Sequence, residues 1–104
     1  MYMEAKSAGL TGPARIGRVT FSKSFKRVYY GAQVFQRLPG GGFKANHYDL
    51  ATGEEYWISG PREDGGDRLY GERVPVAIDE DARAEYWTEI RKQPGRVSEA
   101  DANR

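Results

Sequence analysis

Hydrophobic and polar residues alternate along much of the chain, and this two-residue period is typical of β-strands. Short turn-forming stretches rich in Gly, Pro, Ser or Asp separate the alternating runs. The pattern predicts short strands over residues 16–21, 26–30, 33–38, 43–48, 55–59 and 73–78. Pro75 lacks an amide donor, so we expect the last of these strands at an edge of the sheet.

Residues 43–59 carry the strongest local signal in the chain, which is that of a β-hairpin. Asp49 favours the first position of a turn, and Gly53 can take the left-handed conformation that follows a type I turn. We therefore expect residues 49–54 to form the hairpin loop, with a glycine bulge.

The C-terminal part of the chain changes to the period of a helix. Asp79 can cap the free amides at the helix start. Ala82, Tyr86 and Ile90 then recur every four residues and form an apolar stripe. The Pro-Gly pair at residues 94–95 predicts the end of the helix.

These elements together predict a mainly β fold, namely a small bent antiparallel sheet or barrel of five to six strands with one C-terminal α-helix. Residues 1–14 show no periodicity, and we expect them to be a disordered N-terminus. Residues 15–93 are expected to form a single β-rich domain, followed by a disordered tail over residues 94–104.

Composition narrows the class of protein and its compartment. The chain has 104 residues and no cysteine, which excludes disulfides, thiolate metal sites and cysteine nucleophiles. It shows neither the apolar run of a signal peptide nor one as long as a membrane helix. We therefore expect a cytoplasmic protein with no membrane partner.

Charge is unevenly distributed, although the net charge is only +1. Residues 1–50 hold eight Lys and Arg but only two Asp and Glu, whereas residues 51–104 hold eight Lys and Arg and thirteen Asp and Glu. A basic half favours an anionic partner, but it can equally be attracted to the acidic half within the fold.

The candidate functional surface combines aromatic and basic side chains, because nucleic-acid bases stack on aromatic rings while Arg and Lys hold phosphates. Bent sheets also bind peptides on such faces. The predicted contact residues are Tyr48, Trp57, Arg62, Arg68 and Tyr70. A wider set adds Tyr29, Lys26, Arg27, Arg37 and Lys44. The alternative is that the rings form core and that Arg and Asp in the long loop up to residue 71 pair with each other.

Catalytic and metal chemistry have little support in the sequence. His47 is the only histidine, and a catalytic role would need Ser59 or the acidic residues of the 63–67 loop within reach. No spacing of residues matches a zinc or calcium site, and no phosphate loop is present. We therefore assign no catalytic residue, no metal and no cofactor.

The run YWISGPREDGGDRLYG, with ARIGRVTFSK before it and VAIDEDARAEYWTEIR after it, resembles a family of short, uncharacterised bacterial proteins. The resemblance covers residues 14–92 and implies a compact bacterial domain without implying a mechanism. Members of that family have at times been labelled 1-deoxy-D-xylulose-5-phosphate synthase. The run Asp64-Gly65-Gly66-Asp67 is not the cofactor motif of thiamine-diphosphate enzymes, whose chains are also much longer.

The sequence thus favours a small non-enzymatic binding module whose partner is a protein or single-stranded nucleic acid. A small enzyme that uses His47 and a structural subunit of an assembly are the alternatives. The oligomeric state is left open.

Overall fold

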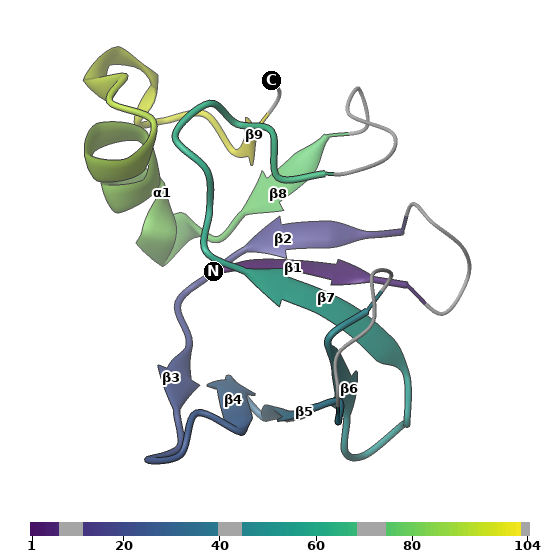
Figure 1. Ribbon diagram of the computed structural model, residues 1–104. Helices are drawn as coiled ribbons and strands as arrows, with labels where there is room; N and C mark the ends of the chain where they lie inside the picture. Colours follow the sequence, from purple (N-terminus) through teal and green to yellow (C-terminus); the bar gives the residue numbers. More distant parts are fainter. Residues whose placement is uncertain (7–11, 40–44, 69–74, 103–104) are drawn as a thin grey trace.

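The chain is built around one curled β-sheet (Figure 1). The computed structural model describes residues 1–6, 12–39, 45–68 and 75–102. The strands in these ranges are β1 Tyr2–Ala5, β2 Ala14–Ile16, β3 Thr20–Phe21, β4 Arg27–Tyr30, β5 Gln33–Arg37, β6 His47–Asp49, β7 Glu55–Ser59, β8 Val76–Ile78 and β9 Asp101–Ala102.

The order of the strands in space is β3-β4-β5-β6-β7-β1-β2-β8-β9. Neighbouring strands are antiparallel except β2 and β8, which are parallel. The sheet curls into a half-barrel, because Met3 on β1 packs in one cluster with Val28 on β4 and Phe35 on β5 although other strands separate them. We call this enclosed side the inner side and the opposite side the outer side.

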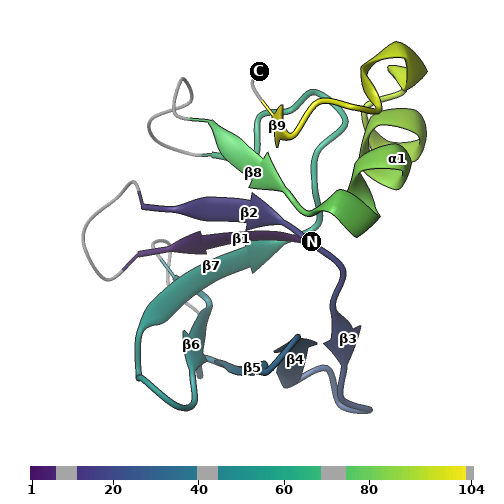
Figure 2. The ribbon, with the colours of Figure 1, turned by 180° about the vertical axis from the view of Figure 1, so that it is seen from behind.

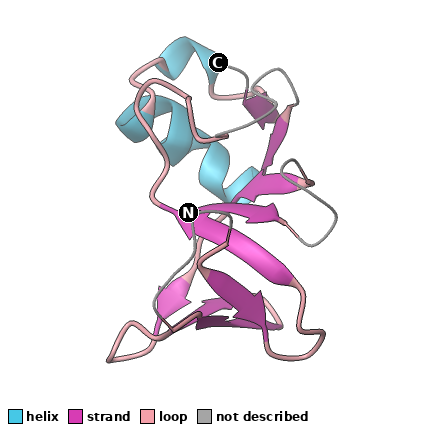
Figure 3. Cartoon of the chain, turned by 45° about the vertical axis from the view of Figure 1, so that its right-hand side comes forward, coloured by secondary structure: helices cyan, strands magenta, loops and turns pink. Residues whose placement is uncertain are grey.

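A helical segment over residues 80–90 covers the outer side of the central strands (Figure 3). It consists of a 3-10 turn Glu80–Ala82, the short α1 Arg83–Glu85 and a π-type turn Tyr86–Ile90. The outer core that it forms with the sheet contains Tyr2, Ile16, Val76, Ile78, Ala82, Tyr86, Trp87 and Ala102. The predicted C-terminal helix is therefore confirmed, and so is the mainly β class.

The predicted hairpin is also confirmed. Strands β6 and β7 pair, with His47 opposite Tyr56. Gly53 has a positive φ of 77°, and its amide donates to the Asp49 carbonyl at 2.7 Å. The Asp49 carboxylate accepts a further bond from the Ala51 amide at 2.8 Å, which fixes the turn.

The predicted number of strands and the purely antiparallel arrangement are wrong. The described residues contain nine strands in a mixed sheet. One reason is that the strand predicted over residues 16–21 is split between β2 and β3. A Cβ atom on Gly17 would lie 2.6 Å from an Asp79 carboxylate oxygen and 2.6 Å from the Tyr30 ring, so glycine is required there. The Tyr30 hydroxyl donates to that carboxylate and joins β4 to the end of β8 across the curl.

The prediction of a disordered N-terminus over residues 1–14 is wrong for the part that is described. Strand β1 lies between β7 and β2 near the middle of the sheet, and residues 7–11 lie outside the described residues. Tyr2 and Met3 are both buried because alternate side chains of β1 enter the outer and the inner core. A run this short carries no recognisable period, which explains the error.

The prediction of a disordered tail over residues 94–104 is also wrong for the described part. Pro94–Arg96 form a 3-10 turn, and β9 pairs with β8. Strand β8 is consequently not at the edge, because it lies between β2 and β9. Pro75 precedes the strand, so its missing amide removes no bond from the β8 ladder.

Met3 provides a direct test of whether β1 belongs to the folded domain. Met3→Ala is expected to lower the free energy of unfolding by about 2–5 kcal/mol, because it leaves a cavity in the inner core. Leu50→Ala, at a side chain that is 43% exposed, is expected to change it by about 0.5 kcal/mol or less. Urea denaturation measures both variants, and equal midpoints would contradict the placement of β1.

Candidate functional site

Of the five predicted contact residues, Tyr48 and Trp57 lie on the outer side of the neighbouring strands β6 and β7, but Arg68 is buried and does not share an exposed surface with them. Tyr48 is half-buried on β6, and Trp57 on β7 packs against the outer core. Arg62 is exposed and Arg68 is buried. Tyr70 lies outside the described residues. The alternative that some of the rings belong to the core therefore holds for Trp57.

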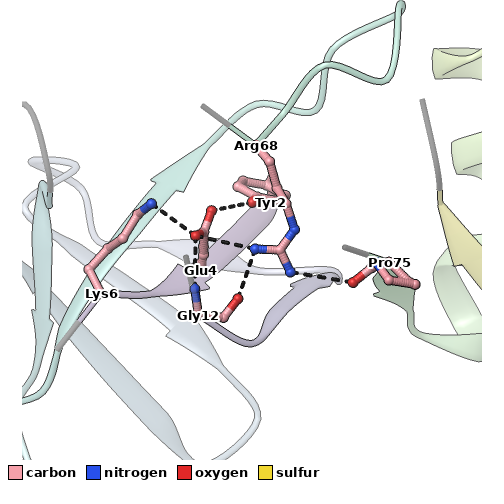
Figure 4. A network of polar contacts seen from close by, with 6 residues as sticks. All are labelled: Tyr2, Glu4, Lys6, Gly12, Arg68 and Pro75. Carbon is pink, nitrogen blue, oxygen red and sulfur yellow. Dashed lines mark hydrogen bonds and ion pairs between the residues drawn. The ribbon is translucent and has the colours of Figure 1, made fainter. Parts of the chain in front are cut away.

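Arg68 belongs to a buried polar network around Glu4 (Figure 4). One Glu4 carboxylate oxygen accepts a bond from the Tyr2 hydroxyl. The other accepts from Lys6 Nζ at 2.9 Å and from the Gly12 amide at 3.2 Å, and lies 3.3 Å from Arg68 Nη1. Burial raises the pKa of Tyr2, and the bond to Glu4 raises it further, so the hydroxyl stays protonated and donates.

The same guanidinium ties three distant segments together. Arg68 Nη1 donates to the Gly12 carbonyl at 2.8 Å, and Nη2 donates to the Pro75 carbonyl at 3.3 Å. These bonds hold the chain before β2 and the chain before β8 against β1 (Figure 4). The role of Arg68 is structural, and the prediction that it contacts a partner is not supported by its position.

The loop after β7 is held by its own acidic residues. Arg62 Nε and Nη2 donate to the two Asp64 carboxylate oxygens at 3.1 and 2.9 Å. The Asp67 carboxylate accepts the Arg62 amide at 2.7 Å, and the Asp64 carboxylate accepts the Gly66 amide at 2.8 Å. The alternative in which arginine and aspartate pair within this loop is the arrangement observed for Arg62.

His47 does not lie beside Ser59, the first of its two predicted catalytic partners. It lies opposite Tyr56, whereas Ser59 pairs with Tyr2, so the serine is roughly 10 Å further along the sheet by strand rise. The imidazole Nδ1 lies 2.9 Å from Asn46 Oδ1. The Asn46 side chain also bonds the backbone amide and carbonyl of Ile58, at 2.8 and 2.7 Å. The histidine is thus part of a structural contact between β6 and β7.

An aromatic and basic surface does exist, on the outer side of β4, β5 and β6. The register places Arg27 beside Gln36 and Gln36 beside Tyr48. Because Val28 enters the inner core, Arg27 and Tyr29 point outward. Arg27 Nε donates to Gln36 Oε1 at 3.1 Å. We call Arg27, Tyr29, Gln36 and Tyr48 the outer patch; the helical segment covers β1, β2 and β8 rather than these strands.

The turn between β3 and β4 lies at the edge of the sheet, next to the outer patch (Figure 2). Phe21 pairs with Val28, so it lies on the inner side of β3, opposite to the side of Arg27 and Tyr29. Phe21 and Phe25 are 42% and 63% exposed, and their ring centroids are 5.6 Å apart. Lys23 and Lys26 are exposed in the same turn. We call Phe21, Lys23, Phe25 and Lys26 the hairpin tip.

Some residues of the outer patch and the hairpin tip were named as candidate contacts from the sequence, and others were not. Tyr48 was among the five predicted contacts, and Arg27, Tyr29 and Lys26 were in the wider set. The two phenylalanines of the tip were not predicted as contacts. The available signal is that Phe21 and Phe25 flank a short polar turn that contains Lys23.

The inner side of the curl holds an open pocket of about 800 Å³. Met3, Phe35 and Tyr56 form the apolar part of its lining. Charged side chains of both signs also line it, namely Arg15, Glu54, Arg68 and Asp101. The lining therefore does not select one charge class of ligand.

No protein-family model, curated protein or solved structure matches the chain. The resemblance to short bacterial proteins therefore stays a prediction. Within the described residues, no helix combines the length and the apolar character needed to cross a membrane.

Arg68 and Arg62 are expected to respond differently to truncation. Arg68→Ala removes a buried cation from Glu4 and is expected to lower the free energy of unfolding by about 3–5 kcal/mol. Arg62→Ala breaks an exposed pair with Asp64 and is expected to cost at most about 1 kcal/mol. Thermal denaturation compares the two variants. Losses of similar size would show that the network around Glu4 does not depend on Arg68.

His47 is expected to make stability depend on pH. Burial, and then the charge of Arg37, lower the pKa of His47 below its ordinary value of 6.5. The unfolded chain therefore takes up this proton at a higher pH than the folded chain, and stability falls as the pH drops through 6.5. Between about pH 7.5 and about pH 5.5, the wild type is expected to lose more stability than His47→Gln in urea denaturation. Equal losses would contradict burial of the imidazole.

Proposed function

We propose that this chain is a non-enzymatic binding domain that takes single-stranded nucleic acid on the outer patch and the hairpin tip. The observation that carries the proposal is the absence of acidic residues from this part of the chain. Between Glu4 and Asp49 the sequence contains no Asp or Glu. This run supplies β2 to β5, and its exposed cations at the hairpin tip and on the outer side include Lys23, Lys26 and Arg27. Arg37 is exposed too, but it lies on the inner side beside His47. The hairpin tip and the Arg27 end of the outer patch are therefore electropositive, whereas exposed Glu55 of β7 lies beside Tyr48 at the other end of the patch. The cationic end favours an anionic partner.

The aromatic residues narrow the class of anion. Tyr29 is 37% exposed, and Tyr48 lies two strands away on the same side of the sheet. Strand spacing and rise put their Cα atoms roughly 12 Å apart, so the two rings are too distant to stack on each other. Each ring can instead stack on a separate base, while Arg27 and the lysines of the tip bind phosphates. This combination favours nucleic acid over a simple anionic ligand.

The geometry favours single strands over duplexes. Stacking on a tyrosine ring requires the flat face of a base, which a duplex keeps covered by its neighbours. A protein partner remains the runner-up, because aromatic and arginine side chains also dominate protein interfaces. The enzyme alternative has no support from the positions of His47 and Ser59.

Truncation of the two tyrosines tests the proposal. Tyr29→Ala and Tyr48→Ala are each expected to weaken binding of a labelled single-stranded oligonucleotide of mixed sequence by about 1–3 kcal/mol, because each removes one stacking surface. Fluorescence anisotropy at fixed salt measures the affinity. Arg62→Ala is the matched control and is expected to bind as the wild type does, because its guanidinium pairs with Asp64 away from the patch.

Salt dependence separates phosphate contacts from other contacts. The affinity of the wild type is expected to fall as salt rises, and Arg27→Ala is expected to reduce the slope of log affinity against log salt by about 1. A wild type that fails to bind any oligonucleotide at low salt would overturn the nucleic-acid assignment and favour a protein partner.

A further inference from the structure

We infer that Phe21 and Phe25 at the hairpin tip form a stacking platform for one unpaired base, and that Phe25 is retained there at a cost to stability. The inference rests on the proposed function and deepens it, because it names the group that the edge of the surface recognises. Three observations support it: the backbone conformation of the turn, the solvent exposure of both phenylalanine rings, and the lysines beside them.

The backbone of Phe25 has a conformation that its side chain disfavours. Its φ is 59°, in the left-handed region where a bulky residue is an outlier. The turn imposes this conformation through three hydrogen bonds around Ser22. The Phe25 amide donates to the Ser22 carbonyl at 2.9 Å, the Arg27 amide donates to Ser22 Oγ at 3.1 Å, and the Ser22 amide donates to the Arg27 carbonyl at 3.0 Å. Asparagine or glycine would take the same backbone with less strain.

Burial does not explain why a phenylalanine occupies this position. Phe25 is 63% exposed and contacts the ring of Phe21, which is itself 42% exposed. A buried ring could offset the strain through the hydrophobic effect, but this ring keeps most of its surface in water. Local conformation and solvation therefore both disfavour phenylalanine here. Strained residues of this kind are concentrated at ligand sites.

Lys92 provides an internal comparison, because it is the other non-glycine residue with positive φ in the described part of the chain. Its φ is 56°, and it follows Arg91, which caps the helical segment. A left-handed residue is the usual way to end a helix, so Lys92 has an ordinary structural explanation. Phe25 lies in a turn between two short strands and has no such explanation.

The charge around the platform specifies the partner. Lys23 and Lys26 are exposed on either side of Phe25, and Arg27 of the outer patch follows directly. A base stacked on the platform would bring its flanking phosphates toward these cations. The partner is thus a single strand that continues from the outer patch over the β3 edge, with an unpaired base on the platform.

Replacement of Phe25 by asparagine separates the two effects. Phe25→Asn is expected to raise the midpoint of thermal unfolding, because it relieves the left-handed strain and removes an exposed ring. The same variant is expected to bind the single-stranded oligonucleotide roughly 5- to 150-fold more weakly, because one stacking contact is lost. Phe25→Trp is expected to retain the affinity. Lys92→Gly is the matched control: it also relieves left-handed strain and raises the midpoint, but it leaves the affinity unchanged.

The outcomes distinguish this inference from the proposed function. If the wild type binds, and Tyr29→Ala weakens binding but Phe25→Asn does not, the platform is wrong and the proposed function stands. If the wild type binds no single strand, the proposed function fails. Equal loss of affinity in Phe25→Asn for a duplex of the same sequence would overturn the assignment to an unpaired base. Binding that depends on Phe25 for vesicles of phosphatidylcholine and phosphatidylserine, but not for the oligonucleotide, would overturn nucleic acid as the partner of the tip.

Discussion

The fold depends on one short strand that is buried on both sides. In β1, Tyr2 enters the outer core under the helical segment, and Met3 enters the inner core inside the curl. A strand with two apolar faces needs cover on both. The helical segment provides that cover on one side, and the sheet provides it on the other by folding β4 and β5 over β1 and β7. The half-barrel shape thus follows from the position of a four-residue strand.

Charged side chains in the interior hold segments of the fold together, whereas those on the surface of β3 to β5 are exposed to solvent. Glu4, Lys6 and Arg68 are buried together, and their mutual bonds hold the segments beside the central strands in one arrangement. Such buried ion pairs contribute more to a specific arrangement than to net stability. The cations of β3 to β5 have no comparable acidic neighbours in the sequence and remain exposed. The helix-covered half therefore supports the fold, and the uncovered half presents the surface that we propose as the binding site.

Local signals in the sequence located some of these features and missed others. The hairpin at Asp49 and the helix after Asp79 were predicted correctly, because a turn and an apolar stripe are both encoded by residues close together in the chain. Strand β1 and the nine-strand count were missed, because strands of two to four residues show no local pattern and form only by pairing with strands that lie far away in the sequence. For the same reason the sequence did not distinguish Arg68, which is buried against Glu4, from Arg62, which pairs within its loop. The aromatic and basic character of the surface was predicted, but its place in the fold depended on which side of each strand was already occupied.

The central position of β1 has a consequence for how the domain is made. Strands β1 and β2 pair with each other, but each has its second partner much later in the sequence, because Tyr2 also pairs with Ser59 and Ile16 with Ile78. Contacts between residues so far apart slow folding, because a long loop must close before any pairing energy is gained. During synthesis, the N-terminal residues leave the ribosome well before β7 and β8 exist. The core is therefore completed only after β8 has been synthesised, and until then β1 can pair with β2 but lacks β7 on its other side.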